Sequence, residues 1–194
     1  MKLKTILAAS VATSIGIGAV AHTGATGIVL ERMQAMSAMG DAVKSVTPIM
    51  KGEQNYDADT VRKAAAVFEE HAGTAMTELF PEDNANEKSY VKDAIWEDWD
   101  EFERIAMRLE TLAQGLSKAA DNGLADEEAA QADMGSMMGG DTASMMGGDA
   151  SGMMGGGSAE TTLAEMADMP ADEVFSELSR TCSTCHTRFR LEKD

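Results

Sequence analysis

The chain has 194 residues and a formal net charge of −17 at pH 7, from 33 acidic and 16 basic side chains. A surface that binds nucleic acid needs a concentration of lysine and arginine to match the phosphate charges, so this composition predicts that the protein binds no nucleic acid. The same charge argues against docking on an anionic membrane surface. A chain of this length supplies the core of one domain rather than two.

The N-terminus has the pattern of a secretory signal peptide. Two lysines among the first four residues precede an uncharged stretch over 6–20, and Ala19–Ala21 fits the A-x-A cleavage pattern. The stretch is too short and too rich in small residues for a transmembrane helix. We therefore expect residues 1–21 to be a signal peptide and residues 22–194 to form a single periplasmic domain, without membrane insertion after cleavage.

Four helices are predicted from the spacing of the apolar residues. The first runs from about Ile28 to Met50, and Pro48 should kink or loosen its last turn. The second opens near Asp59, a suitable N-cap, and ends before Phe80-Pro81. The third and strongest has apolar residues in steps of three and four over 95–116, and the fourth covers about 171–190. Short connections between the first three predict an all-α fold, an antiparallel up-down four-helix bundle.

A segment of different composition separates the third and fourth predicted helices. Residues 122–159 contain three copies of an eight-residue repeat with a Met-Met-Gly-Gly core, and seven of the sixteen methionines of the chain lie there. Glycine at this density disfavours a helix or a packed strand, which predicts a mobile linker. Paired thioethers suit Cu(I), so a copper site and a sacrificial oxidant sink are alternatives to a tolerated repeat expansion.

The most specific motif is Cys182-Ser183-Thr184-Cys185-His186 near the C-terminus. C-x-x-C-H is the attachment signature for covalent heme c, in which both thiols form thioethers and the histidine supplies an axial nitrogen. On a helix the two cysteines and the histidine share one face, so they can meet the same edge of a macrocycle. A zinc site would need further thiolates or histidines, and these are the only two cysteines in the chain. A thioredoxin-like redox dithiol would accompany a βαβ pattern, and the sequence shows no such pattern. We therefore expect one covalent heme c.

A heme motif on the last helix of a four-helix bundle resembles the class II c-type cytochromes, the cytochrome c′ family. The resemblance covers about residues 28–120 and 160–194 and excludes the Met-rich segment. It implies a bundle with covalent heme on the last helix. Besides the bundle pattern, it is carried by Cys182–Arg190, Glu31–Gly40, Lys51–Asp57 and Ile95-Trp96.

The family divides at one position of the first helix. Five-coordinate members have an apolar residue there, whereas low-spin members have a methionine that becomes the sixth iron ligand. The matching residue here is Met36, so the resemblance implies His186 and Met36 as the iron ligands. Arg32 matches an arginine that the family places near the heme edge and its propionates. Met33 and Met39 lie within one turn of Met36, so the assignment depends on the register.

A heme iron with both axial positions filled predicts a periplasmic carrier of single electrons, not an enzyme, that acts with redox partner proteins. If Met36 does not coordinate, the alternative is a five-coordinate cytochrome c′ that binds nitric oxide or carbon monoxide. A second alternative is a copper-handling heme protein that uses the Met-rich repeats. Family members are often homodimers, so the resemblance also implies a homodimer. The basic residues around the motif either pair with propionates, surround an electron-transfer contact or are solvated surface; they are Arg180, Arg188, Arg190 and Lys193.

Overall fold

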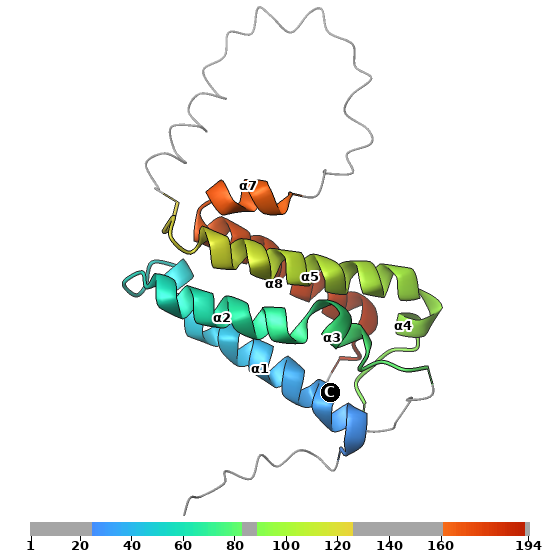
Figure 1. Ribbon diagram of the computed structural model, residues 1–194. Coiled ribbons are helices and arrows are strands. Elements are labelled where there is room, and N and C mark those ends of the chain that lie inside the picture. Colours follow the sequence, from blue (N-terminus) through green and yellow to red (C-terminus); the bar gives the residue numbers. More distant parts are fainter. Residues whose placement is uncertain (1–24, 83–88, 126–160, 193–194) are drawn as a thin grey trace, which may run out of the picture.

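The computed structural model describes residues 25–82, 89–125 and 161–192. In these ranges the regular secondary structure is helical, apart from one isolated bridge between Val91 and Arg190. The long helices are α1 (Gly27–Met50), α2 (Ala58–His71), α5 (Trp99–Ala119) and α8 (Ala171–Phe189), and the short ones are α3 (Gly73–Thr77), α4 (Ala94–Glu97) and α7 (Leu163–Asp168). The long helices form a bundle (Figure 1). The predicted all-α four-helix fold is thus confirmed.

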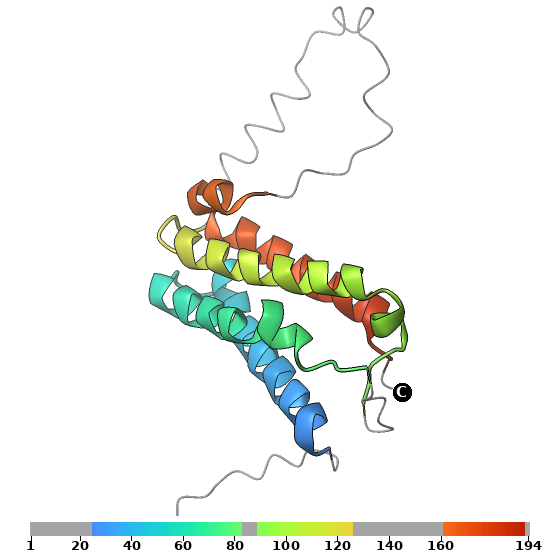
Figure 2. The same cartoon turned by 45° about the vertical axis from the view of Figure 1, so that its right-hand side comes forward.

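The bundle consists of two helix pairs. α1 packs chiefly on α2, α8 packs on α5, and contacts between α2 and α5 join the pairs. Figure 2 shows the two pairs as separate layers. Apolar side chains with less than 2% of their surface exposed form the core between them, among them Val46, Val61, Phe68, Phe102, Leu112, Leu116 and Leu178.

The second predicted helix is broken near its end. α2 stops at His71, Ala72 is extended with ψ of −173°, and α3 begins at Gly73. Gly73 has φ of +58°, and a Cβ atom there would collide with the side chain of Glu110. Only glycine adopts this conformation without strain, so the chain turns here and α3 leaves the axis of α2. The continuous helix expected up to Phe80 is therefore wrong.

The other predicted helices are close to the observed ones. α1 continues through Pro48 and ends at Met50, and α8 ends at Phe189, one residue before the predicted limit. The third predicted helix is divided, because Asp98 has a non-helical backbone between α4 and α5. These differences leave the order and direction of the four long helices as expected.

α7 was not predicted from the sequence. It begins with a capping box, in which the Thr162 side chain accepts a hydrogen bond from Glu165 N and the Glu165 carboxylate accepts one from Thr162 N. Met166 of α7 is 1% exposed and contacts the Gly115 position of α5. The glycine leaves room for the methionine side chain, and this contact fixes α7 on the bundle.

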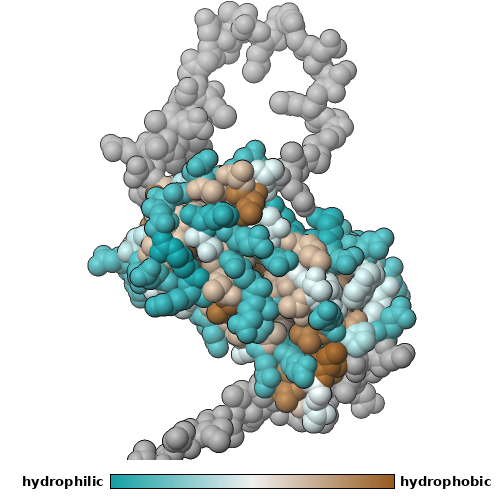
Figure 3. Space-filling view, viewed as in Figure 1, coloured by the Kyte–Doolittle hydropathy of each residue, from teal (hydrophilic) through white to brown (hydrophobic). Residues whose placement is uncertain are grey.

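Two predicted segments lie outside the described residues: the signal peptide, and the repeats of the Met-rich segment. The first residues of the predicted linker are described and belong to the bundle, since Asn122 Nδ2 donates to Ala167 O and Met169 O, and Ala125 N donates to Asp172 Oδ1. Within the three described ranges, no helix is both long and apolar enough to cross a membrane. The face of the molecule in Figure 3 is largely hydrophilic, in keeping with the acidic composition.

The contact between Gly115 and Met166 generates a first prediction. A Cβ atom on Gly115 would lie 2.6 Å from Met166 Sδ and 2.9 Å from its Cβ. We expect Gly115→Ala to lower the free energy of unfolding by about 1–3 kcal/mol through overpacking, although alanine favours a helix. Urea unfolding of the holoprotein measures this. In the Met166→Ala background the same substitution should cost nothing further, and equal costs in both backgrounds would contradict the proposed collision.

Candidate heme-binding site

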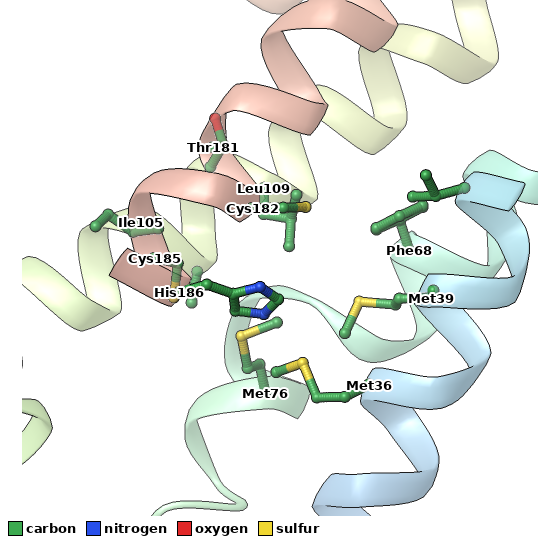
Figure 4. Close-up of a pocket in the computed structure, with 13 residues that line it drawn as sticks. Met36, Met39, Phe68, Met76, Ile105, Leu109, Thr181, Cys182, Cys185 and His186 are labelled. Atoms are coloured by element: carbon green, nitrogen blue, oxygen red, sulfur yellow. The ribbon is translucent and has the colours of Figure 1, made fainter. Parts of the chain in front are cut away.

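The C-x-x-C-H motif lies on the last turns of α8. Cys182 and Cys185 are partly buried, unpaired thiols, and His186 is exposed toward a cavity. All three side chains line this cavity, so they share one face of α8 as their spacing predicts. In Figure 4 the His186 ring projects from α8 toward methionine side chains of α1 and α3.

The motif opens on a first cavity, called here the inner cavity, with about 560 Å³ of space between its atoms, part of it open to solvent. Besides the motif, its walls are almost entirely apolar, with Met36, Met39, Gly40 and Val43 from α1, Phe68 from α2, Met76 from α3, and Ile105, Ala106 and Leu109 from α5.

A second cavity, the outer cavity, adjoins the first and has about 1290 Å³ of space, which also includes open solvent. It is lined mainly by the N-terminal half of α1, residues 89–91 and the end of α8. Both cavities are lined by Met36, Gly40, Cys185 and His186, which we call the junction. The two cavities thus adjoin at the junction, between α1 and α8.

The junction distinguishes the three methionines of α1 that sequence analysis left open. Met33 lines only the outer cavity and Met39 only the inner one, whereas Met36 lines both. Met36 of α1 and His186 of α8 therefore both lie at the boundary between the two cavities. This placement favours Met36 over its two neighbours as the residue that faces His186 across the cavity.

The protonation of the motif argues against a redox dithiol. Burial raises the pKa of both Cys182 and Cys185 to about 11, so the thiols are protonated at neutral pH. Reactive dithiols have the opposite shift, toward the thiolate. Burial, and then the nearby charge of Arg190, lowers the pKa of His186. The imidazole is therefore neutral at neutral pH, the form whose nitrogen binds a metal.

Arg32 is a buried cation without a carboxylate partner among the described residues. It is 5% exposed, with its guanidinium carbon 4.1 Å from the centre of the Phe80 ring. Nε donates to Leu79 O at 3.1 Å and Nη1 to Ser89 Oγ at 3.0 Å, while Nη2 has no hydrogen-bond partner among the described residues. Burial lowers the pKa of Arg32. A buried charge is costly unless paired, so the outer cavity that Arg32 lines suits a ligand with a carboxylate.

Aromatic side chains hold the wall of the outer cavity around this arginine. Phe102 of α5 makes edge contacts with Phe80 and Phe189, with ring centres 4.9 and 5.6 Å apart. Trp96 Nε1 donates to Phe80 O at 3.1 Å, which fixes the segment after α3. The wall is therefore apolar and held in place, as a planar macrocycle requires.

These residues together fit a covalent heme. Two free thiols and a neutral imidazole share one face of a helix, an apolar space lies in front of them, and Arg32 offers an unsatisfied donor for a propionate. The motif, Met36 and Arg32 are the site residues expected from the sequence, and all of them line the two cavities. Three further residues, which the sequence does not single out, line these cavities as well: Met76, Phe80 and Ser89. Met76 and Phe80 were assigned to the core and the end of a helix, and no sequence signal marks Ser89.

Two of the four basic residues around the motif, Arg180 and Arg188, form ion pairs with acidic neighbours. Arg188 forms ion pairs with Asp98 and, at 3.2 Å, with Glu101. Arg180 pairs with Glu177 at 2.7 Å. Lys193 lies outside the described residues, as do the methionine repeats on which the copper hypothesis depends. In the described ranges no group of three or more histidine, cysteine or acidic side chains could hold a metal ion.

The family model for cytochrome c′ matches residues 27–140, more than half of the chain. The chain belongs to the cytochrome c′ family. Membership of this family implies a covalently bound heme c. The family match covers α1 to α5 and ends within the Met-rich segment that precedes the motif.

Similar proteins of known sequence agree with this assignment. Cytochrome c′ of Rhodopseudomonas palustris is 26% identical over 140 residues, which cover 72% of this chain and 90% of the relative. Cytochrome c-556 of Agrobacterium fabrum is 34% identical over 116 residues, which cover 60% of this chain and 76% of the relative. Both relatives are thus matched over most of their length.

Solved structures of cytochromes c′ have the same fold. The nitric oxide complex of a cytochrome c′ variant from Alcaligenes xylosoxidans has a TM-score of 0.54 and 18% identity, and the match covers 85% of this chain and 94% of that one. Another similar cytochrome c′ is described as having a ligand-controlled dimer dissociation. At this level of identity the likeness establishes the four-helix fold.

The position of Arg32 generates a second prediction. Replacing it by leucine removes the buried guanidinium that the wall of the outer cavity offers to a propionate. We expect Arg32→Leu to lower the free energy of unfolding of the holoprotein by about 3–5 kcal/mol, because the negative charge of the heme propionate is left without its partner. The reduction potential should also fall, since loss of a positive charge favours the ferric state. Arg32→Lys is the control that keeps the charge. A potential equal to that of the wild type in Arg32→Leu would contradict the pairing.

Proposed function

We propose that the protein is a periplasmic carrier of single electrons in which heme c, attached at Cys182 and Cys185, is held between His186 and Met36. The observation that carries this proposal is the junction, where His186 of α8 and Met36 of α1 both line the two cavities. When bound, heme c supplies an iron that takes up and releases one electron. A site with both axial positions filled changes oxidation state with little rearrangement.

The residues of the chain support this role in three ways. The neutral imidazole of His186 and the thioether of Met36 are both able to bind iron. The walls of the inner cavity are almost entirely apolar, and burial is one of the properties that set a heme potential. Arg32 supplies a fixed positive charge beside the outer cavity. None of these groups has to move when an electron is taken up or released. Such an arrangement suits an electron carrier, and it gives the protein no catalytic step to perform.

A redox partner would approach the end of the molecule where α8 terminates. Tyr90 and Leu191 are the large apolar residues most exposed in the described ranges, at 40% and 46%, and Leu191 N donates to Tyr90 O at 2.8 Å. Tyr90 also lines the outer cavity. A small apolar surface beside a redox centre is suited to transient contact. Because the protein is strongly acidic, the partner surface that it attracts should be basic.

The second candidate is a five-coordinate cytochrome c′ that binds nitric oxide or carbon monoxide. It is favoured by the apolar lining of the inner cavity, which would admit small uncharged molecules. A similar fold has been solved as a nitric oxide complex. Met36 decides between the candidates, because a thioether on the iron fills the position that a gas would take. A homodimer is compatible with either candidate, and a cytochrome c′ of similar fold is described as having a ligand-controlled dimer dissociation.

The ligand set generates a third prediction. We expect the ferric holoprotein to be low-spin in its electron paramagnetic resonance spectrum and to show a sulfur-to-iron charge-transfer band, and we expect the ferrous form to bind carbon monoxide poorly. In ferrous protein with labelled methionine methyl groups, the ligand resonance assigned to Met36 should vanish in Met36→Leu and persist in the control Met33→Leu. A high-spin wild type would instead support the gas-binding candidate. Survival of that same resonance in Met36→Leu would assign the iron to another residue.

A further inference from the structure

Met76 is a second methionine that faces His186, and it comes from a different element than Met36. It belongs to α3 and is 3% exposed, and it lines the inner cavity together with Met36 and His186. In Figure 4 the side chains of Met36 and Met76 both extend toward the His186 ring from separate helices. Two thioethers thus converge on one imidazole.

The position of Met76 is fixed by the break between α2 and α3. Gly73 has φ of +58° and lies directly under Glu110 of α5, so the turn cannot be altered without displacing one of them. Within α3, Thr77 Oγ1 donates to Thr74 O at 3.1 Å, and α3 packs on α5. The backbone that carries Met76 is therefore anchored at the cavity, whereas its side chain, with three rotatable bonds, can adapt.

Met39, the third methionine of the inner cavity, is placed less favourably. It follows Met36 by three residues on the same helix, which displaces it by about 4.5 Å along the axis and by about 60° around it. Met39 therefore does not share the position of Met36 on α1. Both Met39 and Met76 belong to the buried core, so burial does not distinguish them, whereas the helix from which each one comes does. Met76 is not bound by the geometry of α1, so it can approach the same point as Met36 from another direction.

We propose that Met76 is a second axial thioether, which takes the place opposite His186 when Met36 is absent or displaced. This inference rests on the proposed function, since it assumes a thioether as the sixth ligand. The exchange forms one sulfur–iron bond and breaks another, with no change in charge or oxidation state. Its consequence is that the position stays filled, so that loss of Met36 does not turn the electron carrier into a gas-binding protein.

Leucine replacements in the holoprotein test the proposal. Methionine to leucine conserves volume and costs less than about 1.5 kcal/mol, so the variants should fold, which circular dichroism can check. We expect Met36→Leu to remain low-spin with a shifted charge-transfer band, and Met76→Leu to remain low-spin because Met36 still supplies the thioether. We expect Met36→Leu/Met76→Leu to lose the low-spin signal and to bind carbon monoxide at least about tenfold more tightly than Met36→Leu. Met36→Leu/Met39→Leu is the matched control and should remain low-spin.

Each contrary outcome has a distinct meaning. A low-spin wild type with a fully high-spin Met36→Leu variant would overturn the role of Met76 and leave the proposed function intact, because Met76 would then be core packing alone. A low-spin signal that survives in Met36→Leu/Met76→Leu would also overturn it. A high-spin wild type would overturn the proposed function, and the inference with it. A high-spin Met76→Leu variant would show Met76 to be the primary ligand and contradict the assignment of Met36.

Discussion

The site depends on α1 and α8 facing each other without packing together where the motif lies. Each of these helices has its own main partner, α2 for α1 and α5 for α8, and the contacts between α2 and α5 join the two pairs. The bundle is therefore stable without requiring α1 and α8 to close on each other. The cavity between α1 and α8 stays open because these two helices are held by α2 and α5 and not by close contact with each other.

The break after α2 has an equally direct effect on the site. A continuous helix would carry the chain past the cavity, whereas the turn at Gly73 brings Met76 to the inner cavity and Phe80 under the guanidinium of Arg32. One residue with positive φ thus contributes to both cavities. The apolar wall and the buried cation belong to the same local structure, which explains how a charge is held in a largely hydrophobic space.

The sequence predicted the features that depend on local pattern. The ends of α1 and α8 followed from apolar spacing, and the shared face of Cys182, Cys185 and His186 followed from helix geometry. The break at Gly73 was missed because Glu110, which covers it, is distant in the chain. α7 is too short to show a helical period in its apolar residues, although the Thr162-x-x-Glu165 pattern of its capping box is present in the sequence. The partners of Arg32 lie 47 and 57 residues away, and only the tertiary structure brings them together.

The segment between α5 and α7 joins the bundle at the opposite end of α8 from the heme-binding motif (Figure 1). Ala125 N donates to Asp172 Oδ1, Arg108 donates to Thr161 O at 2.6 Å, and Figure 1 places α7 at the opposite end of α8 from its C-terminus. Both attachment points are thus held independently of what lies between them. A change in the number of eight-residue repeats would therefore leave these two attachment points and the heme-binding motif in place.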